Sequence, residues 1–259
     1  MKICAVYNVW ADGLDLLKKS IDNILPCVDA VIVVWSQSSN YGVKHDGCFR
    51  FVASPSDKKV VFSQYEPDLR LQPHENETRK RNHGLSLAKH LDFDYFVMMD
   101  SDEFYEQDSF NIEKDYMIKN PEVAGTVCKT KVYFKSPELT VGFDHTLVPF
   151  IHKVTPDLQF KLNCKDYPFT YDNDGAAHID PTRRLNITKG VEWSNITMHH
   201  FSWVRSEYEL KIQNSAAKRN LLKSSIYRDL ENAKEGVYNE FYRKELQKCE
   251  NIFNLPVYG

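Results

Sequence analysis

The segment that decides the fold is YFVMMDSDEFY, residues 95–105 of a chain of 259 residues. Its first five residues are apolar and rich in β-forming side chains, which is typical of a buried strand. Asp100, Asp102 and Glu103 follow at once. Ligands of open α/β sheets bind beyond the carboxyl ends of the strands, so this change from apolar to acidic predicts a site directly after residues 95–99.

Two of these carboxylates are spaced to act together. Asp100 and Asp102 lie two residues apart, so extended backbone would point both side chains to one side. Two hard oxygen ligands at that edge of a sheet suit a divalent cation, Mn²⁺ or Mg²⁺, that carries a diphosphate. The alternative is a turn or a helix start, where Asp and Ser often cap backbone N–H groups. The buried strand before the pair favours the metal site.

The pattern of apolar residues elsewhere predicts an α/β fold with a Rossmann-like, mostly parallel central sheet and flanking helices. The predicted strands are residues 3–7, 30–35, 60–62, 95–99, 126–134 and 147–154, and the predicted helices are residues 12–25 and 76–91. Residues 165–184 are polar and predict a loop over the site.

The C-terminal part has a different pattern. Residues 206–222 and 227–249 are charged and helical in period. We therefore expect a catalytic domain over residues 1–205 and a C-terminal helical extension over residues 206–259, packed on the same domain.

Composition argues against several classes of protein. The formal net charge of −3 gives no global attraction to nucleic acid or to anionic membranes. No apolar run approaches the ~20 residues needed to span a bilayer, and residues 1–7 have the pattern of a strand rather than of a signal peptide. The six cysteines are scattered without a CxxC pair, so we expect free, buried thiols and a cytoplasmic location.

A second candidate group is HHFSWVR, residues 199–205. Neutral imidazole is a common metal ligand, and the guanidinium of Arg205 presents a planar fork that suits phosphate oxygens. Alternation along a strand would place His199 and His200 on opposite faces, so only one of them can bind the metal directly. We expect His200 to be that ligand. The alternative is an ordinary strand that buries one histidine.

A third candidate group is HENETRKRNHG, residues 74–84, in the helix that precedes the acidic strand. A basic group there, Arg79 or Arg81, would offset a diphosphate or pair with Asp100. Lys80 is expected to be solvated, and Asn76 or Thr78 to cap the helix.

A resemblance is carried by four motifs: AVYN (residues 5–8), ETRKRN (residues 77–82), MDSDE (residues 99–103) and HHFSWVR (residues 199–205). The chain resembles the GT-A glycosyltransferases of the family 2-like kind, and in particular their small virus-encoded members. The four motifs occur in order and span residues 3 to about 220.

The resemblance implies a metal-dependent enzyme that moves a sugar from a nucleotide-diphosphate donor to a hydroxyl of a glycan or glycoprotein, with inversion. A UDP-sugar is the favoured donor, and a viral member would act in the host cytoplasm. Asp100 and Asp102 would hold Mn²⁺ or Mg²⁺, with His200 completing the shell. The residues that would bind the donor are Val6, Tyr7, Asn8, Ser36, Arg81, Asp100 and Arg205.

An inverting enzyme also needs a carboxylate base that takes the proton of the acceptor hydroxyl. We favour Asp180 and Asp174, which lie in the polar segment expected to cover the site. The other candidates are Glu103, Asp144, Asp166 and Asp172.

Three other functions stay open at this point. The first is a glycosyltransferase whose acceptor is modified phage DNA. It would use Arg183, Arg184 and the lysines near residues 211 and 218 to contact phosphates, although such charges are usually solvated. A nucleotidyltransferase usually has a Gly-rich loop after the first strand, whereas here only Gly13 is present. An inactive carbohydrate-binding or scaffold protein is the third. We also expect Asp102→Asn to abolish activity with little change in thermal stability, as for a ligand at the rim of a site.

Overall fold

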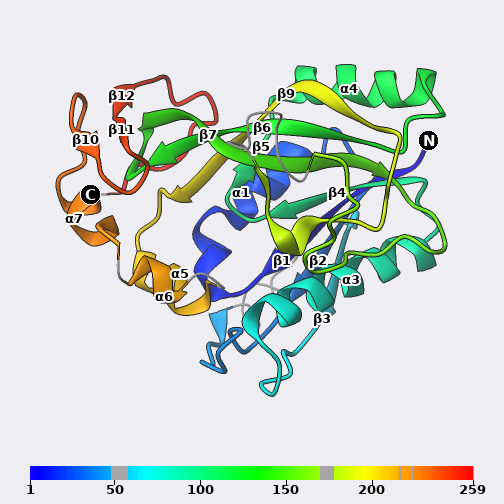
Figure 1. Cartoon of the computed structure of the whole chain (residues 1–259), viewed down its shortest axis with the longest axis horizontal. Coiled ribbons are helices and arrows are strands. Elements are labelled where there is room, and N and C mark those ends of the chain that lie inside the picture. The colour runs from blue at the N-terminus through cyan, green and yellow to red at the C-terminus, as the bar shows by residue number, and fades with distance from the viewer. Residues whose placement is uncertain (48–57, 170–177, 216–217, 223, 259) are drawn as a thin grey trace.

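The computed structural model describes residues 1–47, 58–169, 178–215, 218–222 and 224–258, and these residues form the expected α/β fold (Figure 1). Among them, ten strands join in one central sheet. Its main path runs β3 (Val60–Gln64), β2 (Ala30–Trp35), β1 (Ile3–Val9), β4 (Tyr95–Asp100), β7 (Ser136–Lys153), β6 (Gly125–Phe134), β9 (Val191–Trp203) and β5 (Glu103–Phe104).

The first half of the sheet, β3-β2-β1-β4, is entirely parallel. Its register places Asn8, near the end of β1, opposite Asp100 at the end of β4. The second half is mixed, because β7 is antiparallel to both β4 and β6, whereas β9 is parallel to β6. The expected parallel arrangement thus holds for the four strands whose carboxyl ends meet at one edge.

Helices cover both faces of the sheet, which explains the near-continuous apolar runs of β1 and β2. On one face, α1 (Leu14–Ile24) and α4 (Gln107–Lys119) pack with Ala5 and Tyr7 of β1. On the other face, α3 (Pro73–His90) packs with Cys4 and Val6. Figure 1 shows α3 and α4 at opposite borders of the molecule. The apolar pattern alone did not indicate α4.

Helix α3 begins three residues earlier than the sequence pattern predicts. Pro73 occupies its first turn, and a capping box joins Gln72 to Glu75, whose carboxylate accepts a hydrogen bond from the Gln72 N–H at 2.9 Å. Asn76 is therefore not the cap. Its side chain is fully buried and bonds the backbone of Asp68 instead.

The predicted long helix over residues 227–249 is wrong. The C-terminal part contains α5 (Tyr208–Asn214), α6 (Lys218–Leu221), α7 (Ile226–Glu231), β10 (Tyr238–Asn239), β11 (Lys244–Glu245) and β12 (Gln247–Lys248). Gly236 and Arg243 adopt positive φ angles of 77° and 54°, which turn the chain out of helical geometry. The side chains of Ile212, Ile226 and Leu246 pack on the sheet, so this extension shares a core with it.

The expected absence of a membrane-spanning helix and the expected free cysteines can be compared with the described residues. Among them, no helix combines the length and the apolar character that a membrane crossing requires. Cys4, Cys27, Cys128 and Cys164 are free and buried, and Cys249 is free and partly exposed.

Gly84 tests the packing of α3 on the sheet. Alanine normally stabilises a helix relative to glycine, but a Cβ at this position would lie 2.4 Å from Cγ1 of Val6. We expect Gly84→Ala to lower the free energy of unfolding by about 1–3 kcal/mol, as overpacking does. Urea unfolding measures this change. Ser86→Ala, on the exposed side of the same helix, should be neutral or slightly stabilising; a Gly84→Ala variant as stable as the wild type would contradict the packing.

Candidate functional site

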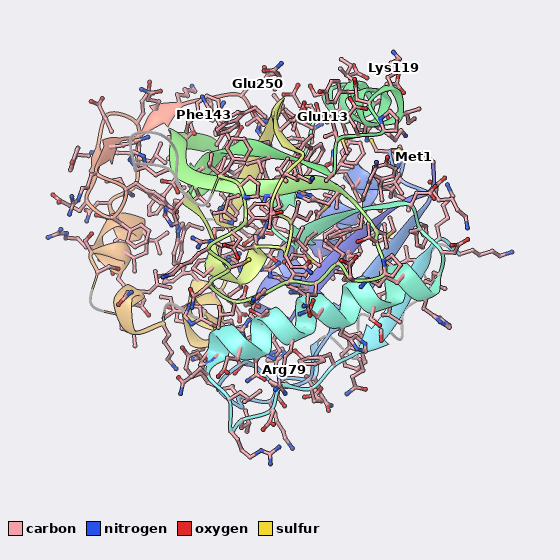
Figure 2. All side chains as sticks on the ribbon, turned by 45° about the vertical axis from the view of Figure 1, so that its right-hand side comes forward. Met1, Arg79, Glu113, Lys119, Phe143 and Glu250 are labelled. Atoms are coloured by element: carbon pink, nitrogen blue, oxygen red, sulfur yellow. The ribbon has the colours of Figure 1, made fainter. Side chains whose placement is uncertain are left out.

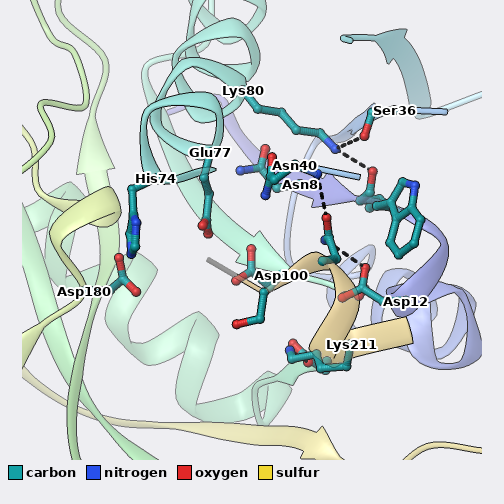
Figure 3. A pocket seen from close by; sticks show the side chains of 16 residues that line it. Asn8, Asp12, Ser36, Asn40, His74, Glu77, Lys80, Asp100, Asp180 and Lys211 are labelled. Carbon is teal, nitrogen blue, oxygen red and sulfur yellow. Dashed lines mark hydrogen bonds and ion pairs between the residues drawn. The ribbon is translucent and has the colours of Figure 1, made fainter. Parts of the chain in front are cut away.

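A polar cleft of about 210 Å³ opens at the carboxyl ends of β1, β2 and β4 (Figure 3). This is the edge at which ligands bind in open α/β sheets. Its walls come from the ends of these strands, from η1 (Ala11–Gly13), α3 and α5, and from the start of η2 (Pro181–Arg183). The lining residues are Asn8, Val9, Trp10, Asp12, Ser36, Asn40, His74, Glu77, Lys80, Asp100, Ser101, Asp102, Asp180, Lys211, Asn214 and Ser215.

Asp100 and Asp102 both border this cleft, but not through the strand alternation that the spacing suggested. Asp100 is the last residue of β4, whereas Ser101 and Asp102 form the turn to β5. Element η1 lies directly against this turn, since a Cβ on Gly13 would be 2.0 Å from Oγ of Ser101. The absence of a side chain at Gly13 thus permits the close approach that sets Asp12 beside the turn.

Two buried arginines hold Asp100. Oδ2 of Asp100 accepts a hydrogen bond from Nη2 of Arg183 at 2.6 Å, and both of its oxygens lie 3.3–3.4 Å from the guanidinium of Arg81. Arg183 also donates to Glu103, and Arg81 donates to Glu77 at 2.8 Å. Asp100 therefore belongs to a network that α3, β4, β5 and η2 build together.

Asp102 is bound by two other cations. Its Oδ2 accepts hydrogen bonds from Nη2 of Arg205 at 2.7 Å and from Nζ of Lys211 at 2.8 Å. Arg205 follows β9 and also donates to the backbone carbonyls of Ser202 and Asp12. Oδ1 of Asp102 is buried and has no hydrogen-bond partner among the described residues.

These cations keep both aspartates ionised. Burial by itself raises the pKa of Asp100, but the charges of Arg183 and Arg81 outweigh it and hold the pKa below its ordinary value. In the same way Lys211, His200 and Arg205 hold the pKa of Asp102 well below its ordinary value against the effect of burial. Asp12 has the opposite balance, since burial raises its pKa to about 6 despite Lys211 and Arg205.

The two histidines of β9 lie on opposite sides of the strand. Nε2 of His200 is 3.7 Å from Oδ1 of Asp102, because the register of β9 pairs His200 with Glu103. His199 is 4% exposed and shares a hydrogen bond of 2.9 Å with the Tyr133 hydroxyl. Burial lowers the pKa of His199 to about 4, so it is a neutral core histidine.

The wall formed by β1, β2 and α3 is polar. The side-chain amide of Asn8 is buried, and neither of its polar atoms has a partner in the described part of the chain. Lys80 is buried rather than solvated, and its ammonium donates to the Val9 carbonyl at 2.6 Å and to Oγ of Ser36 at 3.0 Å (Figure 3). An unsatisfied amide at a cleft wall marks a place where a ligand would form hydrogen bonds.

Four residues expected to bind the donor do not line the cleft. Val6 and Tyr7 are fully buried in the cores on the two faces of the sheet, because successive residues of β1 point to opposite helical layers. Arg81 and Arg205 are 1% and 3% exposed and lie behind the aspartates that they bind. They position Asp100 and Asp102 rather than reach into the cleft. Arg79, marked on α3 in Figure 2, is exposed and does not line the cleft either.

Of the candidate bases, Asp180 borders the cleft. It caps η2 by accepting hydrogen bonds from the N–H and hydroxyl of Thr182, at 2.7 and 2.6 Å, and it faces His74 (Figure 3). Asp174 and Asp172 lie outside the described residues. Asp144 and Asp166 do not line the cleft, and Glu103 is buried behind Asp100.

The arginines that suggested contacts with DNA are buried. Arg183 and Arg184 are 7% and 6% exposed, and their guanidinium groups bond Asp100, Glu103 and the backbone of Ile179. Arg183 is therefore part of the carboxylate network, a role that its position in a polar segment did not indicate.

Asp12, Lys80 and Lys211 line the cleft but were not singled out from the sequence as part of this site. Asp12 and Lys211 are ordinary helix-surface residues in the sequence pattern, and only the approach of η1 and α5 to the turn after β4 brings them to the cleft. The signal that would have found Asp12 is its place just after the end of β1, at the ligand-binding edge.

The side chains around the cleft can be compared with the ligands that a metal ion needs. Among the described residues, no group of three or more His, Cys, Asp or Glu side chains is arranged to hold a metal ion. A smaller arrangement does suit one: the buried, unpartnered Oδ1 of Asp102 faces Nε2 of His200 at 3.7 Å. The carboxylate oxygens of Asp100 and Asp102 are the donor type that Mn²⁺ and Mg²⁺ prefer, and the imidazole of His200 lies beside Asp102.

No family model matches the chain, and no curated protein matches it. TarS 1-349 of S. aureus is 17% identical over 78% of this chain, with a TM-score of 0.44, and this chain spans only 61% of that structure.

Two further solved structures are similarly distant. TarS 1-349 of S. aureus in complex with UDP-GlcNAc is 16% identical over 90% of this chain and 74% of that one, with a TM-score of 0.45. The mannose-1-phosphate geranyltransferase of Thermus thermophilus is 15% identical over 53% of this chain and 43% of that one, with a TM-score of 0.33.

The burial of Asp102 changes what its substitution should do. Asp102→Asn removes the charge that balances Arg205, whose side chain is 2% exposed. We expect the free energy of unfolding to fall by about 3 kcal/mol, as when a buried ion pair loses one partner. Chemical denaturation measures it. The matched control is Asp22→Asn, which breaks an exposed pair with Lys18 and should change stability little. Equal stabilities of the two variants would show that Asp102 is not structural.

Proposed function

We propose that this protein is a glycosyltransferase that moves a sugar from a nucleotide-diphosphate donor to a hydroxyl acceptor. The observation that carries the proposal is the composition of the cleft. Two ionised aspartates and the unsatisfied amide of Asn8 meet at the carboxyl ends of parallel strands, where a nucleotide binds in such sheets.

The two walls of the cleft suit two parts of one donor. Asn8, Ser36 and Asn40 offer neutral hydrogen-bonding groups at the ends of β1 and β2, which suit the base and ribose. Asp100 and Asp102 line the same cleft together with Lys211, and these charged groups suit the diphosphate and its cation. The UDP-sugar expected from the sequence resemblance is the favoured donor.

A divalent cation, Mn²⁺ or Mg²⁺, would be held by Asp102 and His200, with Asp100 beside them. When bound it would offset the negative charge that develops on the leaving nucleoside diphosphate. Asp100 and Asp102 support this proposal, because both border the cleft and the pKa of each is held below its ordinary value despite burial.

Asp180 is the proposed base among the described residues. One of its oxygens is fixed by Thr182, which orients the carboxylate at the cleft border next to His74. From there it would accept the proton of an acceptor hydroxyl, as inversion requires. A glycan or glycoprotein acceptor is proposed rather than DNA, since Arg183 and Arg184 are buried. The viral origin and host-cytoplasmic location remain predictions from the resemblance.

A panel of nucleotide sugars tests the proposal. The protein with Mn²⁺ should release a nucleoside diphosphate from at least one member of the panel, measured by chromatography. Asp100→Asn should reduce the release at least about 100-fold, because this carboxylate borders the reacting groups. Asp144→Asn, on β7 outside the cleft, is the matched control and should retain activity.

Circular dichroism verifies that both variants are folded at the assay temperature. The result that would overturn the proposal is no release from any donor, together with no calorimetric binding of any nucleoside diphosphate in the presence of Mn²⁺.

A further inference from the structure

Lys211 is the most exposed of the cations that bind Asp100 and Asp102. Its side chain is 21% exposed, compared with 1% for Arg81, 8% for Arg183 and 2% for Arg205. It also lines the cleft, whereas the three arginines lie behind the carboxylates. Lys211 is therefore the one cation of this group that can change its partner without leaving a charge buried in the core.

The contacts of α5 agree with such a role. Ile212 is the only residue of this helix that is buried. The remaining described contacts at its end are polar, since the amide of Asn214 bonds Asp12 at 3.3 Å and the backbone N–H of Asn40 at 3.1 Å. A lysine on a long, rotatable side chain at this position reaches Asp102 from the cleft side and can reach a ligand in the cleft as well.

The two carboxylate oxygens of Asp102 differ in their hydrogen-bond partners. Oδ2 is shared by Arg205 and Lys211, whereas Oδ1 is unpartnered and faces His200. An added divalent cation at Asp102 would repel the ammonium of Lys211, which is 2.8 Å from the same carboxylate. Arg205 is buried and donates hydrogen bonds to two backbone carbonyls, which hold its guanidinium in place. The repulsion therefore acts on Lys211.

We propose that Lys211 is an exchangeable counter-ion: it neutralises Asp102 in the free protein and turns to the diphosphate of the donor when a divalent cation occupies that carboxylate. The inference rests on the proposed function, since it assigns a diphosphate-binding residue to the same cleft. Lys211 thereby serves both states of the site, and the carboxylates are never left without a balancing charge.

This exchange requires two effects of opposite sign from one substitution. Lys211→Met removes the competitor for Asp102, so Mn²⁺ alone should bind about tenfold more tightly. The same variant lacks the ammonium that grips phosphate, so the Mn²⁺–pyrophosphate complex should bind about tenfold more weakly. Isothermal calorimetry measures both affinities, and pyrophosphate makes the result independent of the base.

The controls separate charge from fold. Lys211→Arg keeps the charge and should stay close to the wild type in both titrations. Lys18→Met removes an exposed lysine on α1 and should change neither affinity. Lys211→Met leaves Asp102 paired with Arg205, so its melting temperature should stay near that of the wild type.

A second measurement uses the wild-type protein alone. Acylation of lysine amines, followed by peptide mass spectrometry, should label Lys211 faster when Mn²⁺ is added and more slowly when Mn²⁺ and pyrophosphate are added together. Lys18 serves as the internal reference, because its side chain is exposed, pairs with Asp22 and does not line the cleft.

The outcomes distinguish this inference from the proposed function. Tighter Mn²⁺ binding with weaker pyrophosphate binding, or the matching labelling pattern, supports the exchange. Unchanged Mn²⁺ affinity in Lys211→Met, or labelling of Lys211 that ignores Mn²⁺, overturns it while leaving the donor site intact. Absence of any Mn²⁺–pyrophosphate or Mn²⁺–UDP binding by the wild type would overturn both.

Discussion

The cleft depends on the neutralisation of two aspartates, Asp100 and Asp102, that lie two residues apart at the end of a buried strand. Two like charges so close together repel each other, and burial adds a desolvation cost to each. Cations from four segments neutralise the two carboxylates: Arg81 from α3, Arg183 from η2, Arg205 after β9 and Lys211 from α5. Each of these segments is thereby tied to the turn between β4 and β5.

The same ion pairs explain why the site has its present geometry. A buried ion pair adds little net stability compared with an apolar contact, but it strongly penalises any arrangement that separates the partners. Arg183 has to stay against Asp100, so η2 stays at the cleft and Asp180 with it. Arg205 has to stay against Asp102, which places the end of β9 and the backbone of Asp12 together. The network therefore shapes the cleft more than it stabilises the fold.

Local patterns were sufficient for the parallel half of the sheet. The strand over residues 30–35 was predicted with its observed bounds, and β1, β3 and β4 to within two residues at either end, because buried parallel strands are continuous apolar runs. The prediction failed for residues 227–249, where charged residues at helical spacing are compatible with short strands and turns. Helix α7 ends at Glu231, and the positive φ angles at Gly236 and Arg243 keep the residues after it out of helical geometry.

The site was predictable in part for a related reason. Asn8 and Asp100 lie at the ends of β1 and β4, and Ser36 and Asp102 follow the ends of β2 and β4, so the sheet itself brings them together. Arg183 and Lys211 were missed because their partners lie 83 and 109 residues away, and no local pattern encodes such a pairing. Val6 and Tyr7 were misplaced because a strand end lines a cleft only with its last residues. His200 reaches Asp102 through the pairing of β5 with β9, as its alternation with His199 allowed.

The most direct measurement is a crystal structure of the protein grown with UDP and Mn²⁺, with anomalous diffraction recorded at the manganese edge. The charges and the unsatisfied groups of the cleft predict an anomalous peak beside Asp102 and His200, with the diphosphate between it and Lys211 and the nucleoside against Asn8 and Ser36. A nucleotide bound outside this cleft, or manganese bound away from Asp102, would contradict the account.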